Sequence, residues 1–200
     1  MTDDPTVLVL REGVHGMPVE EYATALRERL DCEVHLARTP AEERDLAADA
    51  TVVTGPRIDE SLLAAADSLE LFAGAYAGHS HLPLEAFEER GVAVTNASGV
   101  HAPNVAEHVV GAILAFSRNF HVGRERASRG EWRSYPTGEL QGSTVAVVGL
   151  GAIGSAVVDR LNPFGVRSVG VRGDPSNGGP ADEVVGPDRF HDAIAEAAYV

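Results

Sequence analysis

Short runs of β-branched and aliphatic residues alternate with longer stretches of helical periodicity over the first half of the chain. This alternation predicts strands at 6–10, 32–37, 50–54, 70–75 and 92–95, and helices at 19–30, 61–69 and 83–90. Strands that are joined through helices run parallel in one sheet, and the helices cover both of its faces. Residues 1–97 are therefore predicted to form one flavodoxin-like, doubly wound unit.

The second half of the chain contains a glycine-rich turn that follows an apolar strand. The strand is predicted at 144–148, and Gly149, Gly151 and Gly154 come directly after it in GxGxxG spacing. In such a turn the first glycine permits the sharp bend and the second lets a pyrophosphate approach the backbone. The third lets the following helix pack closely on the sheet. The turn therefore predicts a dinucleotide site.

The residues after this turn fit the same prediction. Ala152 and Ile153 open a helix that extends to Leu161, so their amides are expected to face the phosphates of the dinucleotide. Another strand is predicted at 167–172. Residues 98–200 are thus predicted to form an incomplete Rossmann domain. The predicted fold class of the whole chain is α/β, with two doubly wound parallel-sheet units in succession.

The stretch 103–120 is predicted to be one long helix with an unusually wide apolar face. Two neighbouring stripes make up this face, and their members are Val105, Val109, Ile113, Phe116 and Phe120 in one and Ala106, Val110 and Leu114 in the other. A helix that is apolar over so wide an arc is buried between bodies. We expect it to lie at the domain junction or in a subunit interface, and the intact protein to be a homodimer.

The end of the strand 167–172 indicates which dinucleotide binds. NAD sites place an acidic residue there for the ribose 2′-hydroxyl, whereas this chain has Arg172. A guanidinium can bind a 2′-phosphate in bidentate geometry, so we expect NADP(H) to be preferred. Asp174 lies two residues further on and could still reach a ribose, so NAD(H) stays possible.

Charge narrows the classes of partner. The 200 residues carry a net charge of −14, and all sixteen basic residues are arginine. Nineteen acidic residues and seven arginines lie in 1–97, against eleven and nine in 98–200. Nucleic acids and anionic membranes need a cationic surface, so neither is an expected partner.

The sequence also bears on localisation. Cys32 is the only cysteine, the first residues are acidic and no apolar run could span a bilayer, so we expect a cytoplasmic protein.

Five arginines lie between Arg118 and Arg133, opposed there only by Glu125 and Glu131. The favoured interpretation is a solvated helix whose arginines pair with the acidic first unit, and an anion or RNA patch is the alternative.

Several segments together resemble the D-isomer-specific 2-hydroxyacid dehydrogenases, which include phosphoglycerate dehydrogenases and glyoxylate/hydroxypyruvate reductases. The resemblance runs from about Val52 to Tyr199, and the segments that carry it are AGHSHLP at 77–83, similar to the family's AGVDHLP; RGVAVTN at 90–96; Val105-Ala106-Glu107; Arg118; Trp132; 142–154; and Phe164-Gly165. The lysine-free acidity resembles that of haloarchaeal members of this family.

The resemblance implies roles for several residues. The first unit would be the substrate domain, and backbone amides of the loop Tyr76, Ala77, Gly78 and His79 would hold the carboxylate of a small 2-oxoacid or D-2-hydroxyacid. Val105 would pack near the nicotinamide. The family has Val-Asp where this chain has His79 and Ser80.

The family's catalytic Arg and its His with an acidic partner lie downstream of residue 200. We therefore expect no catalytic residue within residues 1–200, and we expect the chain to be the N-terminal part of a longer NAD(P)-dependent oxidoreductase.

The sequence offers three other functional interpretations: a hydrolase, a metal site and a non-enzymatic binding module. Gly78-His79-Ser80-His81-Leu82 partly matches a hydrolase nucleophile elbow, but Leu82 stands where the second glycine is needed. The histidine pairs 79/81 and 101/108 lack further ligands, so no metal site is predicted. A non-enzymatic dinucleotide-sensing or corepressor-like module on the same scaffold is the alternative to an enzyme.

Overall fold

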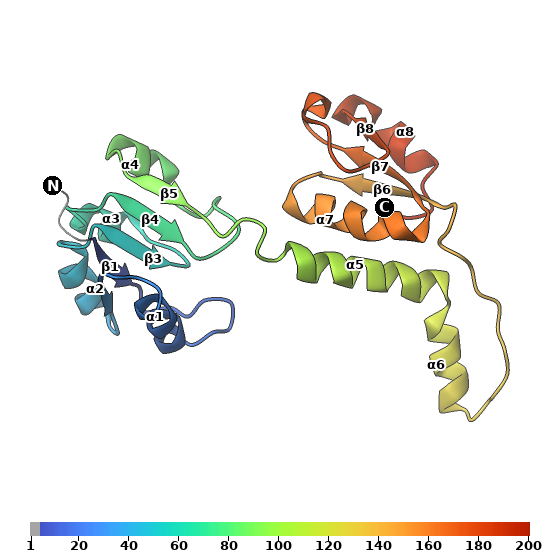
Figure 1. Ribbon diagram of the computed structural model, residues 1–200, viewed down its shortest axis with the longest axis horizontal. Coiled ribbons are helices and arrows are strands. Elements are labelled where there is room, and N and C mark those ends of the chain that lie inside the picture. Colours follow the sequence, from blue (N-terminus) through green and yellow to red (C-terminus); the bar gives the residue numbers. More distant parts are fainter. Residues whose placement is uncertain (1–4) are drawn as a thin grey trace. The chain divides into compact units, whose positions relative to one another are not determined.

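The computed structural model describes residues 5–200 (Figure 1). Residues 1–4, part of the acidic start on which the expectation of a cytoplasmic protein rests, lie outside the described residues. The chain divides between Ser98 and Gly99 into two compact units, and each unit is described by itself below.

The first unit contains a five-stranded sheet in which all neighbouring strands run parallel. Its strands are β1 Thr6–Val9, β2 Glu33–Leu36, β3 Val52–Gly55, β4 Leu71–Gly74 and β5 Ala93–Thr95, and their order in the sheet is β2-β1-β3-β4-β5. This is the strand order of a flavodoxin-like fold, and it confirms the predicted parallel sheet.

Four helices connect these strands: α1 Val19–Arg27, α2 Pro40–Ala47, α3 Glu60–Ala65 and α4 Leu84–Glu89. Helix α2 was not predicted, although its start carries a recognisable signal. Thr39 caps the helix by accepting from the amide of Glu42 at 3.2 Å, and Pro40 occupies the first helical position.

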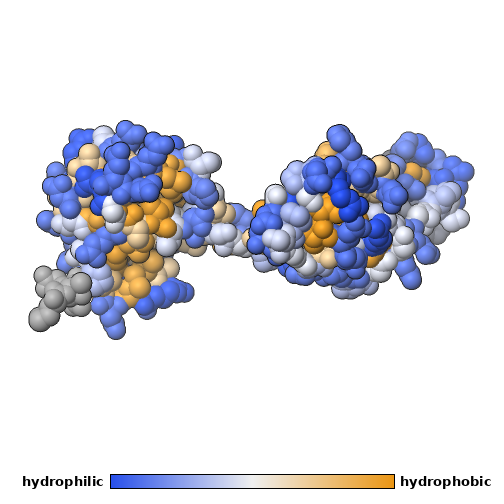
Figure 2. Space-filling view, turned by 90° about the horizontal axis from the view of Figure 1, so that it is seen from above, coloured by the Kyte–Doolittle hydropathy of each residue, from blue (hydrophilic) through white to orange (hydrophobic). Residues whose placement is uncertain are grey.

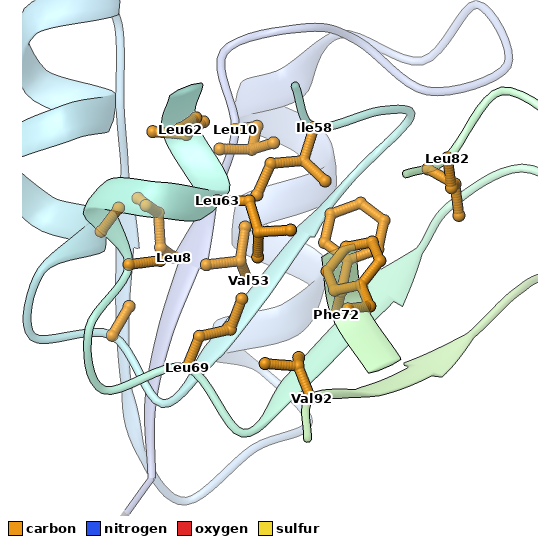
Figure 3. Packing of buried hydrophobic residues seen from close by; sticks show 14 of the residues in the cluster. Leu8, Leu10, Val53, Ile58, Leu62, Leu63, Leu69, Phe72, Leu82 and Val92 are labelled. Carbon is orange, nitrogen blue, oxygen red and sulfur yellow. The ribbon is translucent and has the colours of Figure 1, made fainter. Parts of the chain in front are cut away.

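Alternate residues of the central strand point to opposite faces of the sheet. Leu8 packs with residues of α2, α3 and α4, whereas Val7 and Val9 pack with residues of α1. Figure 3 shows the first of these cores, in which Leu63 of α3 lies beside the sheet residues Val53 and Phe72. Both faces of the sheet are thus covered, as its nearly continuous apolar strands require.

The second unit contains a three-stranded parallel sheet in the order β6-β7-β8. Its elements are α5 Ala102–Ser117, α6 Phe120–Ser128, β6 Thr144–Val148, α7 Ala152–Leu161, β7 Arg167–Val171, β8 Glu183–Val185 and α8 Phe190–Ala195, with 3₁₀ turns at Asn162–Phe164, Pro175–Asn177 and Pro187–Arg189. Its two cores lie on opposite sides of the sheet. One joins β6 to α5 and α7, and the other joins β7 and β8 to α8.

The predicted helix 103–120 is wrong at its C-terminal end. Helix α5 ends at Ser117, and a second helix, α6, begins at Phe120. Asn119 lies between them with a left-handed φ of +51°, which stops the helix because L-residues cannot continue a right-handed helix from there. Phe116, in the last turn of α5, and Phe120, the first residue of α6, are exposed at 70% and 55%, so neither belongs to a buried stripe.

The edge of β6 opposite β7 is paired by the last residues of the chain. The amide of Ala146 donates to the carbonyl of Tyr199 at 2.9 Å, and the amide of Ala198 donates to the carbonyl of Thr144 at 2.9 Å. These bonds form a parallel bridge between Val145 and Tyr199.

On the face seen in Figure 2, apolar side chains gather in patches between polar ones on each unit. Over residues 5–200, none of the helices has both the length and the apolar character to cross a bilayer.

Candidate functional site

The glycine-rich turn joins β6 to α7 at the carboxyl end of the second sheet. Gly149 has a φ of +98°, a region that favours glycine. Its amide donates to the carbonyl of Val171 at 2.8 Å, which ties the turn to the neighbouring strand β7. Gly149 therefore supplies the bend that the sequence assigned to the first glycine.

The other two glycines differ in their surroundings. A β-carbon on Gly154 would overlap the carbonyl oxygen of Gly149, so only glycine lets α7 approach the turn this closely. A β-carbon on Gly151 would meet nothing within 4 Å. Ala152 and Ile153 are exposed at the first two positions of α7, where amides have no acceptor inside the helix. This arrangement leaves an open helix N-terminus of the kind that binds phosphate.

Leu150, within the same turn, is buried at 5% exposure. Its side chain fills the space where β-carbons on Gly170 and Gly179 would lie. The turn is thereby packed both against β7 and against the loop 173–180 that follows β7. Sequence reasoning assigned no role to Leu150, Gly170 or Gly179, since their approach depends on tertiary packing.

Arg172 and Asp174 lie at the start of that loop, and both are engaged. The Nη1 of Arg172 donates to the carbonyl of Gly178 at 2.6 Å. The carboxylate of Asp174 accepts from the hydroxyl of Ser176 at 2.6 Å and from its amide at 3.0 Å. These hydrogen bonds to Ser176 hold the pKa of Asp174 below its ordinary value, so the group stays ionised. Among residues 5–200, the bond to Gly178 is the one side-chain hydrogen bond of the Arg172 guanidinium, which has five N–H donors.

Val105 lies in the first turns of α5, and its amide donates to the carbonyl of His101 at 2.9 Å. The chain reaches this helix past the start of α7, because a β-carbon on Gly99 would contact the methyl group of Ala152 at 3.9 Å. The structure thus brings the segment leading into α5 beside the glycine-rich turn of the same unit.

The loop Tyr76–His79 follows β4 at the carboxyl edge of the first sheet. Three of its four carbonyl groups accept from the protein: that of Tyr76 from the amide of Ala97 at 3.0 Å, that of Ala77 from the Nδ2 of Asn96 at 2.8 Å, and that of His79 from the amide of Leu82 at 3.0 Å.

The amides of this loop behave differently. Within residues 5–200, the amides of Tyr76, Ala77, Gly78 and His79 donate to no protein acceptor. Consecutive free amides with tied carbonyls form a region of positive partial charge, which suits an anion. A β-carbon on Gly78 would meet nothing within 4 Å, so the backbone there is open to a ligand.

Two cavities lie near these features. One, of about 740 Å³, is lined by residues of α5, β6 and α7, among them Ile113, Gly149 and Ile153. The other, of about 810 Å³, lies at the carboxyl ends of β1 and β3 in the first unit. Its two arginines are already paired, Arg11 with Glu43 at 3.2 Å and Arg57 with Glu12 at 2.7 Å. The second cavity therefore offers no unpaired arginine to an anion.

The alternatives raised by the sequence can be compared with this geometry. Ser80 lies six residues after the end of β4 and four before α4, not on a sharp strand-to-helix elbow. Across residues 5–200, no three of the His, Cys, Asp and Glu side chains gather as a metal site.

In the arginine-rich segment the recorded ion pairs are local. Arg129 pairs with Glu125 and Glu131, and Arg133 with Glu131. Acidic residues within the segment itself thus lie close enough to pair with these two arginines.

Comparison with known proteins gives a consistent result. Residues 110–200 match the family "D-isomer specific 2-hydroxyacid dehydrogenase, NAD binding domain". The chain is 32% identical over 159 residues to D-3-phosphoglycerate dehydrogenase of Methanocaldococcus jannaschii, covering 76% of this chain and 30% of the relative. It is 33% identical over 165 residues to glyoxylate reductase/hydroxypyruvate reductase of Mus musculus, covering 76% and 50%. The chain thus spans half or less of these relatives.

Among solved structures, a D-isomer specific 2-hydroxyacid dehydrogenase family protein from Aeromonas salmonicida superposes with a TM-score of 0.77. It is 24% identical, and the match covers 98% of this chain and 62% of that protein, which bears on the fold alone. Because the two relatives above come from organisms as different as Methanocaldococcus jannaschii and Mus musculus, they do not support the expected haloarchaeal source.

Proposed function

Because this chain belongs to the D-isomer specific 2-hydroxyacid dehydrogenase family, we propose that it supplies substrate and dinucleotide binding to an NAD(P)-dependent oxidoreductase. The reaction is hydride transfer between the nicotinamide cofactor and a small 2-oxoacid or D-2-hydroxyacid. The observation that carries the proposal is the row of four free amides at Tyr76–His79, on the same chain as the glycine-rich turn.

In this proposal the first unit binds the carboxylate of the substrate. A carboxylate is acceptor-only when ionised, so it complements the amides of the loop Tyr76–His79, whose carbonyls point their hydrogen bonds into the protein. Backbone amides do not titrate, so this loop orients the substrate and exchanges no proton with it. We assign no proton donor within residues 1–200.

The second unit binds the dinucleotide. The exposed N-terminus of α7 at Gly151, Ala152 and Ile153 receives the pyrophosphate, and Gly154 keeps the helix close to the turn. Val105 packs near the nicotinamide. When bound, the nicotinamide supplies or accepts the hydride.

NADP(H) is the proposed cofactor, with NAD(H) as the alternative. Arg172 stands where NAD-selective sites carry an acidic residue, and it keeps donors for a 2′-phosphate while one nitrogen holds Gly178. Asp174, two residues after Arg172, favours NAD(H). The hydrogen bond from Ser176 keeps its carboxylate ionised, and an ionised carboxylate can accept from the ribose 2′-hydroxyl of NAD(H).

The proposed assembly is a homodimer formed through the exposed aromatic residues of the second unit. Trp132 is fully exposed, and Phe116 and Phe120 are mostly exposed. Exposed large aromatic side chains are enriched at protein interfaces.

The test is an assay of the intact protein with glyoxylate, hydroxypyruvate and pyruvate, each with NADPH and with NADH. We expect oxidation of the dinucleotide and a product of the D configuration where the product is chiral. Preference for L-2-hydroxyacids in the reverse direction would contradict the proposal. Dinucleotide binding without reduction of any of the three would favour a non-enzymatic binding module.

A further inference from the structure

His15 lies in the connection between β1 and α1, far in sequence from the proposed carboxylate-binding loop. Its Nε2 lies 2.8 Å from the carbonyl oxygen of Ala75, the residue directly before that loop. Because a carbonyl only accepts, Nε2 carries a proton in this contact. The imidazole also packs edge-on against the ring of Tyr76, with ring centroids 4.7 Å apart at an interplanar angle of 63°.

The backbone holds His15 in this place. Its φ is +51°, an uncommon conformation for a residue with a side chain, and Val14 and Met17 close the tight turn around it with hydrogen bonds of 3.2 and 2.8 Å. The same connection is anchored at its start, where the amide of Arg11 donates to the buried carboxylate of Glu43 at 2.9 Å. The imidazole is therefore presented to Ala75 by a fixed segment.

A second histidine supports Tyr76 from another side. The ring of His81 lies 6.3 Å from that of Tyr76, and its Nε2 donates to the carbonyl of Pro56 at 2.9 Å. The aromatic group of His15, Tyr76 and His81 thus links the connections that follow β1, β3 and β4.

These contacts restrain the loop backbone at its start. The carbonyls of Tyr76, Ala77 and His79 are held by residues near them in space, and His15 holds the carbonyl of Ala75, directly before the loop. Since each peptide unit fixes an amide and a carbonyl in one plane, holding the carbonyl of Ala75 fixes the direction of the amide of Tyr76.

We propose that His15 is a positioning residue that aims the first amide of the loop at the substrate carboxylate. The inference rests on the proposed function of the loop Tyr76–His79 and assigns His15 a role in that site. His15 acts through Ala75 and Tyr76 and touches no reacting atom. A carboxylate is bound alike in substrate and transition state, so losing this support weakens substrate binding without slowing the chemical step.

The test compares two variants of the intact protein. His15→Gly removes the imidazole and also relieves the left-handed backbone, so folding is not penalised there. His15→Gln keeps an amide donor at a similar reach but loses the ring. We expect His15→Gly to raise KM for the 2-oxoacid about tenfold, with kcat within about twofold and KM for the dinucleotide unchanged. His15→Gln should fall between this variant and the wild type.

The matched control is His35→Ala, which removes a histidine of the same unit that pairs with Glu33 on β2. It should leave both KM values unchanged. A separate readout is hydrogen exchange at the amide of Ala97, which donates to the carbonyl of Tyr76 and should exchange faster in His15→Gly.

Unchanged KM and unchanged exchange in His15→Gly would overturn the assignment of His15. If the wild-type protein reduces no 2-oxoacid, the proposed function fails on its own. In that case, the rate of hydrogen exchange at the amide of Ala97, compared between His15→Gly and the wild type, still decides whether His15 positions the loop.

Discussion

The side chain of Leu150, in the glycine-rich turn, occupies the space that a β-carbon on Gly170 would need in the adjacent strand β7. A residue of the dinucleotide-binding turn and a strand glycine with no ligand role are therefore matched in shape. The stability of the second unit and its affinity for a dinucleotide should respond together to changes at this contact.

Gly170→Ala should destabilise the protein by about 1–3 kcal/mol, as overpacking of a well-packed interior does. It should also weaken dinucleotide binding, because Leu150 must move and carry the turn with it. Urea denaturation and a dinucleotide titration measure the two effects. Gly173→Ala is the control, since its β-carbon would meet nothing within 4 Å. Adding Leu150→Ala to Gly170→Ala should cost less than the sum of the two single changes, and simple additivity would contradict the contact.

Alanine substitution of two helical glycines should have different effects: one variant should lose dinucleotide affinity, and the other should gain stability. Gly154→Ala places a methyl group on the carbonyl oxygen of Gly149, so the turn must shift, and we expect at least a tenfold loss of dinucleotide affinity. Gly111→Ala in α5 meets nothing within 4 Å and should stabilise the protein by about 0.5–1 kcal/mol through helix propensity. Thermal unfolding and dinucleotide titration of both variants provide the measurement. Equal affinities for the two variants would show that the close approach of α7 is not required.

Arg172→Asp should raise KM for NADPH roughly tenfold to a hundredfold, because a charge-assisted contact is lost and repulsion of the 2′-phosphate is added. KM for NADH should be unchanged or lower. Arg172→Gln keeps a donor for the carbonyl of Gly178 and isolates the effect of charge. Steady-state kinetics with both cofactors at one salt concentration decide the matter. Equal losses for both cofactors would mean that Arg172 supports the loop and does not select the cofactor.

The carboxylate of Asp182 should make stability depend on pH in the acidic range. It accepts from the amide and hydroxyl of the fully buried Ser168 at 2.7 and 2.9 Å, and these bonds hold the pKa of Asp182 below its ordinary value. A carboxyl whose pKa is lower in the folded state stabilises the fold fully above its unfolded pKa, near 3.8. That contribution is lost as pH falls through the folded value.

Asp182→Asn should therefore lower stability at neutral pH and reduce its loss between neutral pH and about pH 3. Urea denaturation at a series of pH values measures both. Asp159→Asn, at an exposed position of α7, serves as the control and should leave the profile unchanged. A profile of Asp182→Asn parallel to that of the wild type would exclude this pair as a source of the pH dependence.

Assembly should depend on the exposed aromatic residues of the second unit. If they form the dimer interface, Phe120→Asp or Trp132→Asp in the intact protein should shift sedimentation at high salt from dimer towards monomer, since a desolvated carboxylate opposes association. Leu30→Asp introduces the same charge at an exposed apolar residue of the first unit and should have no such effect. A wild-type protein that sediments only as a monomer would remove the proposal.

Much of the architecture was predictable because apolar periodicity is a local signal. Strands 6–10 and 144–148 were placed to within a residue, and the glycine spacing at 149–154 located the turn. Helix α2 also has local signals in the sequence, since Thr39 caps it and Pro40 occupies its first position, but apolar periodicity alone does not predict it. The end of α5 was missed because the left-handed Asn119 has no strong sequence signature when apolar residues continue on both sides of it.

The site was predictable only where one segment forms it. The loop 76–79 is predicted as a site from its own residues, but the donors that hold its carbonyls could not be, because Asn96 and Ala97 reach it from the segment after β5. His15 gave no signal, since its contact with Ala75 spans 60 residues and depends on how two loops meet. The fit of Leu150 on Gly170 was hidden for the same reason.

The polarity of the loop Tyr76–His79 limits what it can recognise. The carbonyls of Tyr76, Ala77 and His79 already accept hydrogen bonds from the protein, whereas the four amides do not donate to it, so the loop offers a ligand more donors than acceptors. A primary amide or an ammonium group would bring its own hydrogens to a surface with few acceptors left, and those hydrogens would lose water without full replacement. The loop therefore discriminates by the direction of hydrogen bonding. We therefore expect an ionised 2-oxoacid to bind more tightly than the corresponding 2-oxoamide, which is nearly identical in size and shape.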